Sequence, residues 1–428
     1  MWFIDLVTAT LTKYIRVFVT KKLLIIGYVW PEPNSSAAGS RMLQLIELFL
    51  SYNYTITFAS PCAKSDKAFN LETIGVKQVA IELNNVSFDV FVKTLDPQIV
   101  FFDRFMMEEQ FGWRVAEQCP NAIKILDTED LHGLRKGRQE ALRAGESFNL
   151  NHLYNDTSKR EIASIYRCDL SLIISEAEME LLKTDFKVPE SLLLYVPFLL
   201  NLLSTSKIEK LPNFQERQHF ITIGNFLHEP NFNAVLYVKE TIWPLIRKQL
   251  PKAELHVFGA YASQKVTNLH NETQGFLIKG FAEDVSKVME KAKVCLAPIR
   301  FGAGLKGKLV DAMTSGTPCV VTSVGAEGMF GSLKPNGFVV DNPIDFSNKS
   351  VKLYLDETLW FEKQQNGIEV LNKRFQKASF QNNILERIEG ISMQLETHRL
   401  ENFTGQMLQH QYLQSTKYLS KWIEEKNK

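Results

Sequence analysis

The feature that most constrains the fold is a repeated alternation of short apolar segments with longer segments of helical spacing. Residues 22–27 read KLLIIG, and residues 123–127 read IKILD, so their central side chains are apolar regardless of which way they point. Strand-length segments of this kind, separated by helices, predict a parallel sheet that is covered by helices on both faces. In such sheets, ligands bind at the carboxyl ends of the strands.

The alternation occurs twice along the 428 residues, with a polar interruption over 197–218 that we interpret as a linker. The first set of expected strands is 22–27, 54–59, 98–103, 123–127 and 170–175, with helices at 42–50, 108–118, 129–146, 157–167 and 176–184. The second set is 219–224, 254–259, 276–279, 293–298 and 318–322, with helices at 231–250, 283–291 and 305–315. We therefore predict two tandem α/β domains, 22–200 and 208–375. An extension, 1–21, precedes them, and a helical segment, 376–428, follows and packs back on the domains.

Composition excludes several classes of protein. Hydrophobic residues make up 45% and charged residues 23% of the chain, which is typical of a globular protein. The net charge of +1 lacks the basic excess of a nucleic-acid binder, so we expect no nucleic-acid partner. The five cysteines form no CxxC pair, which argues against a disulfide scaffold or a zinc knuckle and favours a reducing, cytoplasmic location.

The first twenty residues have apolar side chains at helical spacing, at positions 4, 7, 11, 14, 15 and 18. One interpretation is a peripheral helix at the inner face of a membrane, with Lys13, Arg16, Lys21 and Lys22 facing anionic headgroups. The other is a helix docked on its own domain, or a frayed extension, and we favour this one. Asp5 and the interrupted apolar run argue against a signal peptide.

The segment 297–328 carries the clearest chemical signal, since it reads as strand, glycine loop, helix and strand. Gly302 and Gly304 would let backbone amides approach a ligand, and a helix N-terminus favours an anion. Lys308 lies in the first turn, and Asp311 lies about 10 Å along the axis from Gly304. A diphosphate at the helix start and ribose hydroxyls near the acid fit this spacing. The alternative is a turn that merely starts a helix, with a surface ion pair.

Residues 301–328 (FGAGLKGKLVDAMTSGTPCVVTSVGAEG) resemble the C-terminal nucleotide-sugar site of the group 1 (family four) glycosyltransferases. Other segments resemble the family in the same order: 39–41, 126–138, 175–182, 223–233 (IGNFLHEPNFN), 243–247 and 279–284 (KGFAED). The resemblance covers most of 22–375. It implies the GT-B fold, in which two Rossmann-like domains face each other across a cleft. The second domain would bind a nucleotide-diphosphate sugar, and the first would bind a glycan, lipid-linked or other acceptor.

Carried over by position, the resemblance also assigns site residues. On the donor side these are Gly302, Ala303, Gly304, Lys306 and Lys308 for the diphosphate, Asp311 for the ribose, Gly280 and Phe281 for the base, and Gly224 and Asn225 for the cleft wall. The small-residue loop of the first domain contributes Gly39 and Arg41. Two positions depart from the family: Ala303 stands where Glu is frequent, and Asn225 stands where Arg is frequent.

Acceptor-side candidates follow the strands of the first domain: Asp103, Arg104, Asp130, His132 and Glu176. We assign His132 a catalytic role with Lys308 and Asp311, as a group that bonds a sugar hydroxyl; the alternative is a histidine that caps or bridges the next helix. Arg135, Lys136, Arg138 and Arg143 form a basic helix face. That face could meet a lipid phosphate, although a solvated face is the interpretation we favour.

The resemblance implies a retaining transfer in which the leaving diphosphate helps to deprotonate the acceptor, with no protein nucleophile. We expect no metal or other cofactor, because no ligand motif is present and 127–130 (DTED) reads as a loop and cap. The leading hypothesis is a glycosyltransferase of polysaccharide or cell-envelope biosynthesis. The alternatives are a nucleotide-sugar epimerase and a non-catalytic binder. A nicotinamide-dependent oxidoreductase is disfavoured, because no GxGxxG motif follows the first strand.

Overall fold

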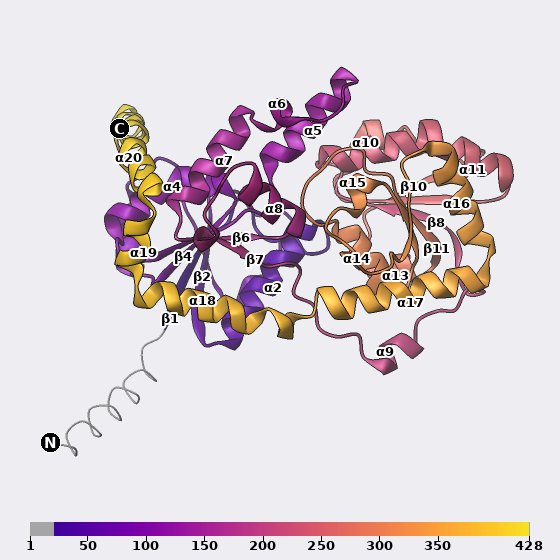
Figure 1. Cartoon of the computed structure of the whole chain (residues 1–428), viewed down its shortest axis with the longest axis horizontal. Helices are drawn as coiled ribbons and strands as arrows, with labels where there is room; N and C mark the ends of the chain where they lie inside the picture. Colours follow the sequence, from indigo (N-terminus) through magenta and orange to yellow (C-terminus); the bar gives the residue numbers. More distant parts are fainter. Residues whose placement is uncertain (1–20, 428) are drawn as a thin grey trace, which may run out of the picture.

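The computed structural model describes residues 21–427, which form two parallel sheets with helices on both faces (Figure 1). All seven strands of the first sheet run parallel, in the order β3-β2-β1-β4-β5-β6-β7. Their bounds are β1 Lys21–Ile26, β2 Tyr54–Ser60, β3 Lys77–Ala80, β4 Ile99–Asp103, β5 Ile123–Asp127, β6 Leu170–Ile173 and β7 Leu193–Tyr195.

The second sheet has six parallel strands in the order β10-β9-β8-β11-β12-β13. Their bounds are β8 Gln218–Ile223, β9 Leu255–Phe258, β10 Phe276–Gly280, β11 Ala292–Ala297, β12 Cys319–Val321 and β13 Gly337–Val339. The predicted α/β fold with two doubly wound sheets is confirmed.

The apolar strands are buried on both faces, as the sequence pattern requires. In β1, Leu23 and Ile25 belong to one core cluster, while Leu24 and Ile26 belong to the cluster on the opposite face of the sheet. Successive side chains of a strand point to opposite faces, so each face needs its own cover of helices. Around the first sheet these are η1 Leu71–Ile74, α2 Ala37–Ser51, α3 Ser87–Leu95, α4 Phe105–Gln118, α5 His132–Ala144, α6 Leu150–Leu153, α7 Asp156–Arg167, α8 Glu176–Thr184 and η2 Glu190–Leu192.

Around the second sheet lie α10 Glu229–Tyr237, η3 Val238–Ile242, α11 Trp243–Gln249, α12 Gln264–Thr267, α13 Val285–Glu290, α14 Gly307–Thr314, α15 Ser323–Ala326, α16 Pro343–Leu355 and α17 Glu357–Arg374. The helix expected over 231–250 is interrupted by the π turn η3. Pro244 in the first turn of α11 lacks the amide hydrogen that a regular α-helix would use there.

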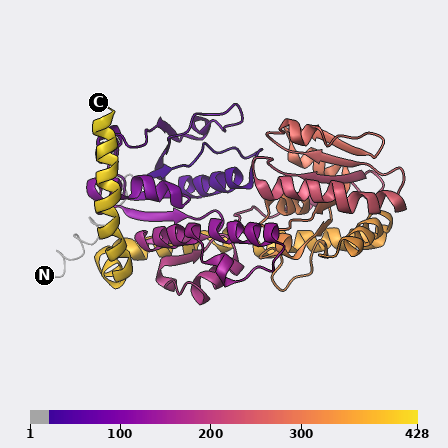
Figure 2. The same ribbon diagram turned by 90° about the horizontal axis from the view of Figure 1, so that it is seen from above.

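After α17 the chain returns to the first domain. Leu200 and Gln376 form a parallel bridge, with N–O distances of 2.7 Å from Leu200 to Phe375 and from Lys377 to Leu200. The remaining elements are α9 Thr205–Glu209 in the linker, then η4 Lys377–Ser379, α18 Gln381–Met393, α19 Leu395–Glu401 and α20 Phe403–Lys426. Ile384 and Ile388 of α18 join the core of the first domain, and Figure 2 shows α20 lying across the end of that domain.

Residues 1–20 lie outside the described residues, so both interpretations of that segment stay predictions. Among residues 21–427, none of the helices has both the length and the apolar character that a membrane span requires.

Candidate active site

A cleft of about 860 Å³ lies between the domains and is lined by loops at the carboxyl ends of strands from both sheets. From the first domain these loops follow β1, β4 and β5, and from the second they follow β8, β9, β10 and β11. Ligands bind at this edge of parallel sheets, and here the two edges face each other. The cleft is therefore the candidate site.

Two helix N-termini meet in the cleft. Helix α14 of the second domain begins at Gly307, and helix α2 of the first domain begins at Ala37, with Ser36 as its N-cap. A Cβ on Gly307 would lie 2.5 Å from the Cβ of Ala37, so only glycine allows this approach. Gly39 is equally constrained, because its Cβ would lie 2.5 Å from the backbone of Glu32. The positive ends of both helix dipoles thus favour an anion at one place.

Two lysines of the predicted set line the cleft, and their ammonium groups differ in their partners. Lys308 donates to Asn231 Oδ1 at 2.9 Å, and burial lowers the pKa of Lys308 to about 8. Lys306 donates to the carbonyls of Ala303 (3.0 Å) and Gly304 (2.6 Å), so it closes the glycine loop on itself. Burial raises the pKa of Asp311, one turn beyond Lys308, to about 7, although Lys308 opposes the shift.

The glycine loop is held partly by the other domain. Gly302 and Ala303 line the cleft, but the Gly304 amide donates to Glu178 Oε1 at 2.7 Å. Gly304 has φ +63°, and its Cβ would lie 2.8 Å from Asp130 Cβ. The expectation that this amide faces a diphosphate is therefore corrected, because Glu178 already occupies it. Ala303 also joins a core cluster of the first domain.

The remaining donor-side residues form the wall of the second domain. Gly224 lines the cleft. A Cβ at this position would lie 2.6 Å from Asn231 Cγ, so glycine leaves the space that the Asn231 side chain occupies. Asn225 lines it too, but its Oδ1 accepts the amide of Leu227 at 2.8 Å. Phe281 faces the cleft, whereas Gly280 lies beside it and accepts the amide of Gly259 at 2.8 Å.

Contacts from the first domain close the Phe281 end of the cleft. Tyr261 donates its hydroxyl to the Glu32 carboxylate at 2.8 Å, and Lys67 Nζ lies 4.9 Å from the centroid of the Phe281 ring. The domains therefore touch on both sides of the cleft.

The acceptor-side wall contains a strained and charged group of residues. Asp103 Oδ2 accepts the amide of Tyr28 at 3.0 Å, while its buried Oδ1 has no hydrogen-bond partner among the described residues. Burial raises the pKa of Asp103. Arg104 and Glu129 follow adjacent strands and have φ values of +71° and +61°. Such backbone strain in non-glycine residues is found preferentially at functional sites.

His132 lines the cleft as the first residue of α5. Its Nδ1 lies 3.1 Å from the Asp130 carbonyl and 3.4 Å from carboxylates of Asp130 and Glu161. The helix is capped by Glu161, which accepts the amides of His132 (3.0 Å) and Gly133 (3.1 Å). Burial would raise the pKa of Asp130, but Arg135 and the two nearby histidines outweigh it and lower that pKa.

Arg41 is placed away from the cleft, which corrects its assignment to substrate binding. Its side chain is 1% exposed and donates three hydrogen bonds to the Asp127 carboxylate, the shortest at 2.8 Å. It also donates to the carbonyls of Val196 (2.7 Å) and Pro197 (3.0 Å). Arg41 thus joins α2, β5 and the segment after β7 inside the first domain.

Two arginines of the predicted basic face of α5, Arg138 and Arg143, and also Glu176, contact the second domain. Arg138 donates to the Gly302 carbonyl at 2.8 Å and to both oxygens of Glu327. Arg143 pairs with Glu229 at 3.4 Å, and Glu176 pairs with Arg374 at 2.6 Å. The four basic residues therefore do not act as one surface: Arg135 pairs with Asp130, and Lys136 is exposed.

Two residues of the site were missed from the sequence, Glu178 and His228. His228 follows β8 and lines the cleft opposite Asp130. The surrounding protein and Arg135 lower the pKa of His228 to about 3. Its place in a loop after a strand could have identified it; Glu178, inside a helix, gave no such signal.

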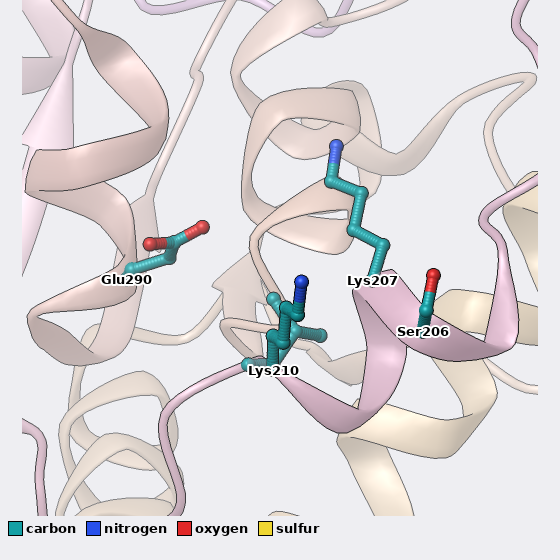
Figure 3. Close-up of a pocket in the computed structure, with 5 residues that line it drawn as sticks. Ser206, Lys207, Lys210 and Glu290 are labelled. Atoms are coloured by element: carbon teal, nitrogen blue, oxygen red, sulfur yellow. The ribbon is translucent and has the colours of Figure 1, made fainter.

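A separate hollow of about 350 Å³ lies at the linker and is lined by Ser206, Lys207, Lys210, Leu211 and Glu290 (Figure 3). It shares no residue with the cleft. Within residues 21–427, no group of three His, Cys, Asp or Glu side chains is arranged to hold a metal ion.

Comparison with known proteins identifies the architecture. Residues 217–356 match the family model of "Glycosyl transferases group 1", and no curated protein sequence matches the chain. HepE from Anabaena, in complex with UDP and glucose, superposes with a TM-score of 0.65 at 13% identity, covering 86% of this chain and 99% of HepE. WaaG, a glycosyltransferase involved in lipopolysaccharide biosynthesis, superposes with a TM-score of 0.59 at 11% identity (86% and 100% covered).

A mutant of TarM from S. aureus, in complex with fondaparinux, alpha-GlcNAc-glycerol and UDP, superposes with a TM-score of 0.54 at 16% identity. The alignment covers 70% of this chain, which spans 58% of that TarM chain. The resemblance to group 1 glycosyltransferases and the GT-B fold are thereby confirmed.

Proposed function

We propose that this protein is a glycosyltransferase that uses a nucleotide-diphosphate sugar. The observation that carries the proposal is the meeting of the α14 and α2 N-termini, with Lys308 beside them, in the cleft between two parallel sheets. This arrangement concentrates positive potential where a diphosphate would lie. The family match over the second domain, and the UDP bound to HepE and TarM, favour a UDP-sugar.

The donor would lie along α14. Its diphosphate would accept hydrogen bonds from the first-turn amides and from Lys308, and the ribose would lie near Asp311, about 4.5 Å further along the axis. The base would lie toward Phe281. Lys306 would act indirectly, since its ammonium holds the carbonyls of the glycine loop.

In the reaction, the bond from the anomeric carbon to the diphosphate oxygen breaks, and the acceptor oxygen bonds to that carbon. The acceptor attacks from the face on which the diphosphate leaves, so the configuration is retained. Its proton passes to a phosphate oxygen of the leaving group, and no residue is modified. Charge grows on the diphosphate during this step, and preorganised amides and a lysine stabilise it most in the transition state.

The acceptor would bind at the wall of the first domain, where Asp103, Arg104, Asp130 and His132 face the cleft. Carboxylates, a guanidinium and an imidazole are groups that bond sugar hydroxyls. A glycan or lipid-linked acceptor fits this wall, and we place the reaction in polysaccharide or cell-envelope biosynthesis at the cytoplasmic side.

The proposal is tested with a panel of UDP-, GDP- and ADP-sugars, with and without mixed glycan acceptors. We expect slow release of one nucleotide that accelerates with an acceptor, and a product with the anomeric configuration of the donor by NMR. Interconversion of the donor without an acceptor would identify an epimerase. Binding without turnover of any donor would identify a non-catalytic binder.

Replacing His132 with alanine is expected to lower the transfer rate at least about tenfold, while the Kd for the free nucleotide changes less than about twofold. The imidazole lies on the acceptor side, so its loss removes a hydroxyl partner and spares the donor site. Single-turnover kinetics and calorimetry measure the two effects. Wild-type transfer in this variant would refute the role of His132.

A further inference from the structure

We infer that Glu178 is a positioning residue that fixes the acceptor-side loop of the first domain against the glycine loop of the second. The expected effect on catalysis rests on the proposed function, whereas the contact between the two loops does not. Glu178 lies in the first turn of α8 and is fully buried. Figure 1 shows α8 on the side of the first domain that faces the second.

A single oxygen makes the connection. Glu178 Oε1 accepts the amide of Leu131 at 2.9 Å and the amide of Gly304 at 2.7 Å. Leu131 directly precedes His132, and Gly304 precedes the N-cap of α14 by two residues. The carboxyl group therefore sets the distance between the acceptor wall and the turn that would hold the diphosphate.

The surfaces around this contact are shaped for close approach. At Gly328, a Cβ would lie 2.5 Å from Ser175 Oγ, at the N-cap of the same helix. At Gly304, a Cβ would collide with Asp130. The N-cap of α8 and the Asp130 loop thus each approach a glycine of the second domain closely, which makes the Glu178 contact part of a fitted interface.

The protonation of Glu178 suits this role. Burial and the nearby Asp130 raise its pKa to about 8, against the opposing effects of the two amides and Lys306; Arg41 is a further nearby cation. Oε2 has no hydrogen-bond partner among the described residues. At neutral pH the group is mostly a neutral acid whose carbonyl oxygen accepts both amides, and glutamine has the same shape and acceptor.

The test compares E178A and E178Q with the control E176Q. Glu176 lies on the same helix and also contacts the second domain, through an ion pair with Arg374. Residue-resolved amide exchange is measured without substrate. We expect E178A to accelerate exchange at Leu131 and Gly304 at least about tenfold, and E178Q and E176Q to leave both within about twofold. Unchanged exchange at Gly304 in E178A would overturn the inference.

Kinetics and the pH dependence of stability give a second readout, and the pH comparison of wild type with E178Q stands even where E178A does not fold. We expect kcat/KM to fall about tenfold or more in E178A and to be restored in E178Q at pH 7. The unfolded-state pKa is about 4.5 and the folded value about 8. Wild-type stability should therefore fall as pH rises through this interval relative to E178Q, because the folded state holds the extra proton. An equal loss of kcat/KM in E178A and E178Q would refute the role of Glu178. Parallel pH profiles of stability for wild type and E178Q would refute it as well.

The two proposals fail differently. If wild-type protein transfers no sugar but exchange responds as expected, the proposed function fails and the positioning contact remains. If transfer occurs and exchange at Gly304 is insensitive to Glu178, only the positioning role fails.

Discussion

Replacing Lys308 with alanine is expected to lower kcat/KM for the sugar donor by about two to three orders of magnitude. The Lys308 ammonium lies beside the N-terminus of α14 and is withdrawn from bulk water, so its attraction for the growing diphosphate charge is weakly screened. Because this charge is largest in the transition state, kcat should fall more than the affinity for the nucleotide. Steady-state kinetics with the active donor and calorimetric binding of the nucleotide separate the two effects.

The matched control is Lys287→Ala. Lys287 is an exposed cation of the same domain, on α13, and pairs with Asp284 at 3.4 Å. It should behave as wild type in both measurements. If Lys308→Ala retained wild-type kcat and nucleotide affinity, the assignment of the diphosphate to the α14 turn would be abandoned.

Replacing Arg41 with alanine is expected to lower the free energy of unfolding of the first domain by about 3–5 kcal/mol. The variant leaves the Asp127 carboxylate buried without its partner and orphans the carbonyls of Val196 and Pro197. Urea denaturation, followed by amide exchange of first-domain peptides, measures the loss domain by domain.

Two further variants identify the cause. Arg143→Ala removes an exposed arginine paired with Glu229, and should cost about 0–1 kcal/mol. The paired change Arg41→Met with Asp127→Leu removes both buried charges and should be much less destabilising than Arg41→Ala. A small effect of Arg41→Ala would contradict the structural role assigned to that side chain.

The central strands were predictable because burial on both faces leaves an uninterrupted apolar segment, as in β1 and β4. The short strands β3, β7 and β13 were not. β3 reads KQVA and lies half exposed at the sheet edge, and β7 and β13 have three residues each. Such strands owe their conformation to pairing with a neighbour, which local pattern does not record.

The candidate site was predictable where one segment supplies both the turn and the charge, as Gly302 and Lys308 do. It was not predictable where another domain acts on that segment, as Glu178 does on Gly304. Arg41 shows a second limit. It is two residues from Gly39, and residues two apart on a helix point about 200° apart, so one faces the cleft and the other the core.

The chain passes between the two domains twice, and the two passages are bonded to each other, which affects how the domains can move. The outgoing segment at Leu200 and the returning segment at Gln376 run side by side, joined by two backbone hydrogen bonds. Two crossings joined in this way restrict sliding of one domain past the other more than a single crossing would. The two domains should therefore open and close about a single hinge axis at this crossing. Opening would separate the N-termini of α14 and α2, and closing would return them to the same relative position for the next substrate molecule.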